Sequence, residues 1–173
     1  DYYQDIKLLL DFCKTHNTFL IPRAAGTSLA GQVVGAGIVV DVSKNLNQIL
    51  EVNAQEKWVR VQAGVVLQQL NQYLKPYNLL FGPETSTANR CCIGGMVGNN
   101  SCGLHSLVYG SARDHLLEAK VILADGKQVL LKQYSEEEFS AKAQQEDLEG
   151  KIYKYIESTY SNEDLKKEII ENF

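Results

Sequence analysis

The stretch IPRAAGTSLAG, Ile21 to Gly31, leaves a strand of buried character and then loses almost all of its side-chain bulk. Pro22 fixes the direction of the chain as it leaves the strand, and residues 24–26 carry almost no side chain. Successive backbone N–H groups in such a run converge on one point and form an anion nest, to which Thr27 and Ser28 add hydroxyl donors. Because a hydrogen bond to a charged group contributes about 1.5–3 kcal/mol, three or four donors suffice for a diphosphate.

The loop matches neither of the two commonest phosphate-binding signatures. The sequence has no G-x-x-x-x-G-K-[ST] string, so a Walker A loop is excluded. No G-x-G-x-x-G follows the first strand, and the glycines at 35 and 37 precede a strand where a dinucleotide fingerprint needs a helix. A phosphate-binding loop of either of these two kinds is therefore excluded.

A second, longer stretch, FGPETSTANRCCIGGMVGNNSCGLHSLVYG from Phe81 to Gly110, holds four glycines within ten residues. Ile93–Gly98 is expected to form a short helix whose N-terminus faces an anion, and the glycines admit a flat ligand. Two loops of this kind from two lobes predict a dinucleotide held extended between them. The alternative is that both loops are merely tight turns at the junction of the lobes.

Periodicity predicts an α+β fold of two lobes followed by a helical segment. The first lobe, residues 1–45, has a helix at 5–15 and strands at 18–22 and 37–42, as in a small α/β unit. The second lobe, residues 46–134, has a mainly antiparallel sheet flanked by helices. It comprises strands at 49–53, 57–62, 116–123 and 128–131 and a helix at 65–73. Its Asp125-Gly126 pair is a strong hairpin signal.

Charge and cysteine content exclude several other classes of protein. Residues 1–134 contain 12 basic and 10 acidic residues, so no nucleic-acid footprint is indicated, and no apolar run has the length of a membrane span. Residues 135–173 contain 5 basic and 11 acidic residues and are expected to be a solvated helical linker, with Ile152, Tyr155 and Ile156 as one stripe. The four cysteines match no metal or cluster spacing and are expected to be free, mostly buried thiols of an intracellular protein.

Three motifs together carry a family resemblance. PRAAGTSLAGQ (22–32), GPETSTANRCCIGGMVGNNSCG (82–103) and YGSARDHLLEAKVILADG (109–126) resemble, in order and spacing, the flavin-contacting segments of FAD-linked oxidases of the vanillyl-alcohol oxidase / p-cresol methylhydroxylase type. Within that family the sequence is most similar to D-lactate, glycolate and D-2-hydroxyglutarate dehydrogenases, and to large bacterial members fused to an iron–sulfur region. The resemblance implies a two-lobed FAD-binding domain that precedes a separate substrate domain.

The resemblance also implies which residues bind the cofactor. The first loop would line the diphosphate, the second the diphosphate, ribityl chain and isoalloxazine, and one strand residue the adenosine end. These residues are Arg23, Ala24, Ala25, Gly26, Thr27, Ser28, Leu29, Pro83, Ser86, Thr87, Ile93, Gly94, Gly95, Gly98, Asn99, Ser101, Gly103, His105 and Ile122. Two of them have an equally simple structural explanation: Arg23 as a surface ion pair, and His105 as a partner of a local carbonyl.

The departures from the family pattern shape the functional hypothesis. Covalent members place a flavin-linking His where this chain has Thr27, so the resemblance implies non-covalent FAD. The substrate-binding residues of the family come from a cap domain beyond this chain, and the strand that precedes the first helix is missing, so we expect an N-terminally truncated fragment with no catalytic residues and no metal ligands of its own.

The resulting hypothesis is the FAD domain of a dehydrogenase in which a 2-hydroxy acid passes a hydride to flavin. Electrons would leave through an acceptor protein or a fused iron–sulfur region. We expect a cytoplasmic location, with any membrane association made through that acceptor. Two alternatives stay open: a flavin-binding subunit without its own substrate site, and an NADPH-dependent reductase of the same fold, as in the UDP-N-acetylenolpyruvoylglucosamine reductases.

Overall fold

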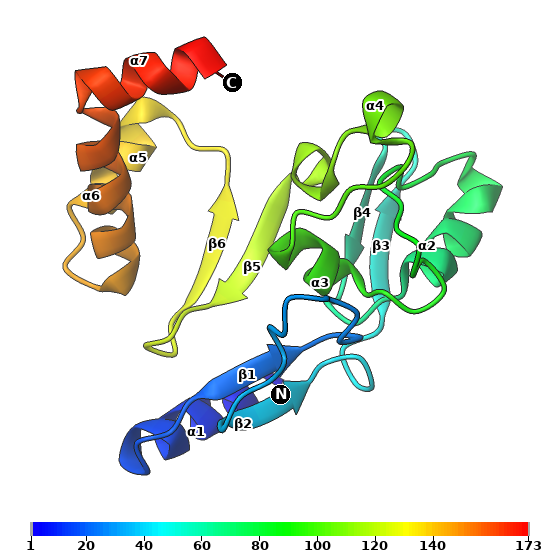
Figure 1. The fold of residues 1–173 in the computed structure, drawn as a ribbon, viewed down its shortest axis with the longest axis horizontal. Coiled ribbons are helices and arrows are strands. Elements are labelled where there is room, and N and C mark those ends of the chain that lie inside the picture. Colours follow the sequence, from blue (N-terminus) through cyan, green and yellow to red (C-terminus); the bar gives the residue numbers. More distant parts are fainter. Residues whose placement is uncertain (1, 173) are drawn as a thin grey trace. The chain divides into compact units, whose positions relative to one another are not determined.

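The structure is a computed structural model that describes residues 2–172 (Figure 1). Its elements run in the order α1 (Tyr2–Thr15), β1 (Leu20–Arg23), β2 (Ile38–Asp41), β3 (Ile49–Asn53), β4 (Trp58–Val61), α2 (Leu67–Leu74), η1 (Lys75–Tyr77), α3 (Ile93–Gly98), α4 (Ser106–Tyr109), η2 (Ala112–His115), β5 (Glu118–Ile122), β6 (Gln128–Lys132), α5 (Glu136–Ala143), α6 (Leu148–Tyr160) and α7 (Glu163–Asn172). The mixed α+β class predicted from the sequence is confirmed.

The chain divides into two compact units. Phe12–Leu116 forms one, called here the loop unit because it holds both glycine loops. Asp1–Asp11 and Leu117–Phe173 form the other, called here the hairpin–helix unit. The boundaries of these units differ from those of the lobes expected at residues 1–45 and 46–134, and the lobes stay a prediction.

Strands β1 and β2 of the loop unit pair in parallel, as the α/β character of the first segment implies. Leu20 lies opposite Ile38, and Arg23 lies opposite Asp41. Parallel neighbours run in the same direction, so both strands end at the same edge of the sheet. The first glycine loop therefore begins at the edge where β2 ends.

The core of the loop unit lies between a hairpin and two helices (Figure 1). Strands β3 and β4 pair antiparallel, as predicted, with Val52 opposite Val59. Helix α2 has its leucines at helical spacing, and Leu67, Leu70 and Leu74 are all buried. They form one cluster with Val65, Cys91, Ile93, Met96 and Ala112. Burial of a leucine-sized side chain contributes about 1.5–3 kcal/mol, so this cluster gives the second glycine loop a rigid base.

The hairpin–helix unit contains the predicted Asp-Gly hairpin. Strands β5 and β6 pair antiparallel, and Gly126 adopts a φ of +90° in the turn between them. The Gly126 amide donates to the Leu123 carbonyl at 2.9 Å, which closes the turn. Helices α5 and α6 follow, each begun by a side-chain cap, Ser135 for α5 and Asp147 for α6.

The apolar stripe predicted on the last segment is wrong. The side chains of Ile152, Tyr155 and Ile156 are exposed, at 41%, 73% and 36%. The buried aromatic residue of α6 is Tyr153, which packs edge-on against Phe139 with ring centroids 5.2 Å apart. The helices therefore make a small core of their own, centred on Tyr153 and Phe139.

A buried carboxylate joins the hairpin to helix α6. The Glu149 side chain is only 3% exposed and accepts from Lys127 Nζ at 2.9 Å and from Lys142 Nζ. Burial by itself raises the pKa of Glu149, but the hydrogen bonds from the two lysines outweigh it and leave the pKa below its usual value. The residue is therefore ionised at neutral pH, and its charge is matched within the hairpin–helix unit.

The four cysteines are free thiols. Cys13, Cys91 and Cys92 are buried, and Cys102 is exposed, so the expectation of mostly buried thiols is confirmed.

Among residues 2–172, no helix has the length and apolar character needed to cross a membrane.

Candidate cofactor-binding site

The first glycine loop starts from an ion pair at the ends of two strands. Arg23 Nη1 lies 3.3 Å from Asp41 Oδ2, and the Val42 amide donates to the Arg23 carbonyl at 2.9 Å. Asp41 also accepts from the amide and the hydroxyl of Ser43, at 2.9 and 2.6 Å. The surface ion pair considered for Arg23 is therefore present, and it fixes the start of the loop.

Inside the first loop, the backbone conformation favours glycine at position 26, and the Arg23 side chain packs against it. The φ of Gly26 is +67°, a conformation that favours glycine, and a Cβ built there would lie 2.9 Å from Arg23 Nε. The Ser28 hydroxyl donates to Gln32 Oε1 at 2.5 Å, whereas the Leu29 side chain is fully exposed. The Ser28 donor is thus engaged within the loop itself.

The second glycine loop is anchored to helix α2 at its beginning. The Asn71 side chain accepts from the Phe81 amide at 2.9 Å and donates to the Phe81 carbonyl at 3.2 Å. Pro83, two residues on, is fully buried. These contacts hold the loop against the same helix whose leucines form the core.

The two arms of the second loop close on each other at Glu84. A Cβ at Gly103 would meet the Glu84 carbonyl oxygen at less than 3.0 Å, so the two backbones approach closely here. His105 Nδ1 lies 2.8 Å from Glu84 Oε1, within hydrogen-bond distance, and the Ser106 hydroxyl donates to the Gly103 carbonyl. His105 therefore pairs with a carboxylate, where the sequence suggested a carbonyl or the flavin.

Helix α3 lies in the middle of the second loop, at the predicted residues. Its first two amides are already used: Ile93 N–H donates to the Val65 carbonyl at 2.9 Å, and Gly94 N–H donates to the Ala63 carbonyl at 2.8 Å. A Cβ at Gly94 would lie 2.6 Å from the Ala63 Cβ. These two amides are thus tied to the preceding segment and do not face an anion.

The two loops meet at Gly95. A Cβ there would lie 3.2 Å from the Cβ of Ala24 in the first loop, and Gly95 itself is exposed. Gly98, one turn later, is also exposed, and a Cβ there would meet no described atom within 4 Å. A helical glycine costs about 0.5–1 kcal/mol relative to alanine, and no packing within residues 2–172 explains this one. This face of α3 is therefore bare beside the first loop, as close approach of an external ligand requires.

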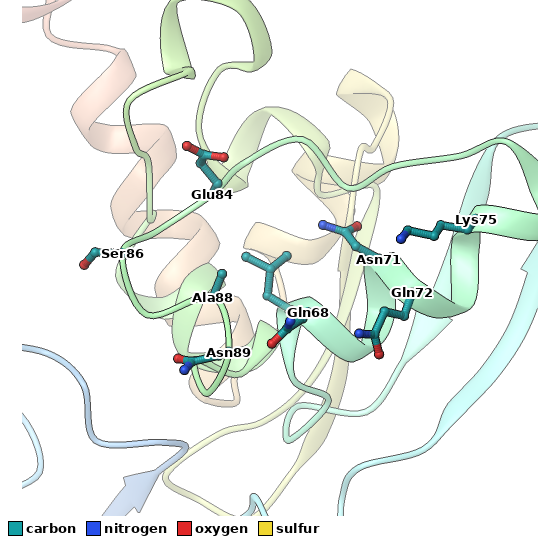
Figure 2. A pocket seen from close by; sticks show the side chains of 9 residues that line it. Gln68, Asn71, Gln72, Lys75, Glu84, Ser86, Ala88 and Asn89 are labelled. Atoms are coloured by element: carbon teal, nitrogen blue, oxygen red, sulfur yellow. The ribbon is translucent and has the colours of Figure 1, made fainter.

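A hollow of about 460 Å³ is lined by α2 and by the first part of the second loop (Figure 2). Gln68, Asn71 and Gln72 of α2 border it together with Lys75, and the loop contributes Glu84, Ser86, Ala88 and Asn89. Neither Ala24 nor Gly95 lines it. The hollow is thus separate from the place where Ala24 and Gly95 meet.

All but one of the residues predicted to bind the cofactor lie in the loop unit. The exception is Ile122, the last residue of β5 in the hairpin–helix unit, so its part in the site stays a prediction. Sequence reasoning missed Ala63, Gly64 and Asp41. A Cβ at Gly64 would lie 2.5 Å from the Val42 carbonyl oxygen, which makes Ala63-Gly64 the junction between the end of β2 and the start of α3. The sequence signal that could have identified this junction is the pair of small residues Ala63-Gly64 directly after the strand predicted at 57–62.

Comparison with known proteins assigns this architecture to a class. Residues 2–132 match the family model described as FAD binding domain. The fold resembles 6-hydroxy-D-nicotine oxidase from Arthrobacter nicotinovorans, with a TM-score of 0.66 and 19% identity over 75% of this chain and 28% of that one. It also resembles an alkyldihydroxyacetonephosphate synthase, with a TM-score of 0.65 and 20% identity over 76% of this chain and 26% of that one.

Relatives by sequence include three kinds of hydroxy-acid enzyme. The chain is 50% identical to a D-2-hydroxyglutarate dehydrogenase of Escherichia coli over 61% of its length and 10% of the relative. It is 33% identical to a mitochondrial cytochrome-type D-lactate dehydrogenase of Kluyveromyces lactis, over 71% of this chain and 22% of that one. It is also 33% identical to a glycolate oxidase subunit of Bacillus subtilis, over 70% and 26%. The chain thus spans between 10% and 26% of the length of these three relatives. It belongs to the FAD binding domain family.

Proposed function

We propose that the chain holds FAD non-covalently where its two glycine loops meet. The observation that carries this proposal is the bare face of α3, where Gly95 abuts Ala24 and Gly98 faces open space. The residues fit the group: small side chains on both loops leave backbone and hydroxyl donors within reach of a long anionic ligand. Thr27 stands where covalent relatives carry a flavin-linking histidine, which supports a non-covalent site.

Within this site each loop has its own task. The first loop, Arg23 to Leu29, would hold the diphosphate through its amides and its arginine. The second loop would hold the diphosphate, ribityl chain and ring through Ser86, Thr87 and the residues from Gly95 to Ser101. Ile93 and Gly94 would serve the site indirectly, because their amides anchor the start of α3. When bound, FAD supplies the capacity to accept a hydride from an alcohol carbon. The protein's part is to orient that group and to keep it in place.

The whole protein is proposed to be a D-2-hydroxy-acid dehydrogenase. Identity of 50% to D-2-hydroxyglutarate dehydrogenases supports this substrate class over the nicotinamide-dependent reductase considered above. The substrate carboxylate would be bound by a cap domain outside this chain. The electron acceptor or a fused iron–sulfur region, and a cytoplasmic location, belong to the same proposal.

Binding of FAD tests the proposed site directly. We expect the chain to bind FAD more tightly than FMN, because only FAD places a diphosphate across both loops. A flavin fluorescence titration with each ligand measures the two dissociation constants. Acid precipitation of the FAD complex should then leave all the flavin in the supernatant. Equal affinity for both flavins, or flavin retained in the pellet, would contradict the proposal.

The substrate class is tested on the full-length protein loaded with FAD. We expect D-2-hydroxyglutarate, D-lactate or glycolate to bleach the flavin absorbance under anaerobic conditions, and NADPH to leave it unchanged. Bleaching by NADPH alone would favour the reductase. Bleaching by none of the four, with FAD bound, would favour a flavin-binding subunit that has no substrate site.

A further inference from the structure

Arg23 is the one charged residue in the sequence of the first loop, residues 22–32. The second loop, residues 82–103, contains one cation, Arg90, and one anion, Glu84. Arg90 is exposed and donates to Asn89 Oδ1 at 2.9 Å, within its own turn. A diphosphate that leaves water loses the solvation of its charges, and a cation at the site offsets that loss.

The guanidinium of Arg23 lies over the first loop. A Cβ at Gly26 would lie 2.9 Å from Arg23 Nε and 3.4 Å from Nη2, so these two nitrogens lie against the Gly26 backbone. The ion pair with Asp41 uses Nη1. In the described part of the chain, Nε and Nη2 have no protein partner, and the side chain is 43% exposed. N–H donors on Nε and Nη2 are thus left beside the Gly26 backbone.

Asp41 holds the guanidinium in this orientation. It lies opposite Arg23 in the β1–β2 register, and its side chain is 28% exposed. The hydroxyl and the amide of Ser43, with a smaller contribution from Arg23, hold the pKa of Asp41 below its usual value. The carboxylate is therefore ionised at neutral pH, and its contact with Nη1 orients the guanidinium.

We propose that Arg23 is the residue that neutralises the diphosphate of FAD, and that Asp41 is its positioning residue. The inference rests on the proposed FAD site and adds to it a division of labour. The loop amides would donate hydrogen bonds to the diphosphate, and Arg23 would offset its charge through Nε and Nη2. Asp41 orients the guanidinium through its contact with Nη1. A Cβ at Gly26 would shift the guanidinium away from the loop backbone, in addition to straining the positive φ of this residue.

The test compares FAD dissociation constants of four variants of this chain by fluorescence titration. Arg23→Met keeps the length of the stem but removes the charge, and should weaken FAD binding about tenfold to hundredfold. Arg23→Lys should recover only part of the loss, since a single ammonium cannot reproduce the guanidinium's three nitrogens, which contact Asp41 and the diphosphate at the same time. Arg90→Met is the matched control and should change the affinity less than about twofold, because its contact is local and exposed.

Asp41→Asn separates positioning from simple electrostatics. Removing a negative charge near an anion would tighten binding if Asp41 only competed for Arg23. If Asp41 positions Arg23, FAD binding weakens, because an amide N–H then faces the guanidinium. Wild-type affinity should also fall more steeply with added KCl than that of Arg23→Met, since screening acts only on charges that are present.

The outcomes distinguish the two proposals. Absence of FAD binding by the wild-type chain would overturn the proposed site, and this inference with it. FAD binding by Arg23→Met at wild-type affinity, or with an unchanged salt dependence, would overturn the role of Arg23 alone. Tighter binding by Asp41→Asn would overturn the positioning role of Asp41. Circular dichroism of each variant checks that the fold is retained, and Arg23→Lys decides the role of Arg23 if Arg23→Met is unfolded.

Discussion

Replacement of Gly103 by valine is expected to abolish FAD binding and to lower the free energy of unfolding by about 3 kcal/mol. The added Cβ would overlap the Glu84 carbonyl oxygen, a backbone atom that cannot turn aside as a long side chain can. The two arms of the second loop must then separate. Separation also breaks the contact between His105 and Glu84 and the hydrogen bond from Ser106 to Gly103.

Gly98→Ala is the control for the stability of Gly103→Val only, because Gly98 belongs to the bare face of α3 that is proposed to admit FAD, so its substitution is expected to weaken FAD binding as well. A methyl group there would meet no described atom within 4 Å, and alanine is the better helix former, so the free energy of unfolding should rise by about 0.5–1 kcal/mol. Urea titration followed by circular dichroism measures both variants, and flavin fluorescence measures their affinity for FAD. If Gly103→Val bound FAD within about threefold of the wild-type affinity, the close approach of Gly103 to Glu84 would have no role in the site.

The second large effect is expected in the other unit. Glu149→Ala should lower the free energy of unfolding by about 3 kcal/mol, because it leaves Lys127 and Lys142 without the buried carboxylate they share. The loss lies at the lower end of the range for a broken buried pair, since the lysine side chains are 40% and 24% exposed and can regain water. Glu146→Ala, an exposed change three residues earlier, should change the stability by less than about 0.5 kcal/mol.

The same carboxylate makes the stability depend on pH. The pKa of Glu149 is lower in the folded chain than its usual value of 4.5, so the folded state binds fewer protons than the unfolded state. The stabilisation is therefore present above pH 4.5 and is lost as the pH falls through the lowered pKa. Urea midpoints measured at several pH values should fall less steeply in Glu149→Gln than in the wild type. Parallel curves would show that Glu149 makes no net contribution.

How much the sequence predicts depends on how local the cause of each feature is. The hairpin at Asp125-Gly126 and the short helix at Ile93–Gly98 were predicted at nearly the observed residues, because turn chemistry and glycine spacing are local signals. The stripe on α6 was predicted from its apolar residues Ile152, Tyr155 and Ile156, which are exposed. The buried residues of α6 include Glu149, whose partner Lys127 lies 22 residues away.

The candidate site shows the same limit. Composition indicated both loops, and the family resemblance indicated their ligand. Neither revealed that the loops meet through Ala24 and Gly95, or that Gly94 is fully used in packing against Ala63. Such contacts join segments about 30 to 70 residues apart, and only the tertiary arrangement reveals which glycine serves the fold and which stays bare.

The placement of the four thiols gives the chain an internal reporter. All four cysteines belong to the loop unit, three of them with 4% exposure or less, while Cys102 on the second loop is exposed. Burial raises the pKa of the Cys92 thiol, which slows its alkylation further. A chain treated briefly with iodoacetamide would therefore carry one adduct, and further mass increments would appear only as the loop unit opens. Mass spectrometry of such a time course measures local unfolding of the loop unit without any engineered label. Opening of the hairpin–helix unit adds no mass, because that unit contains no cysteine.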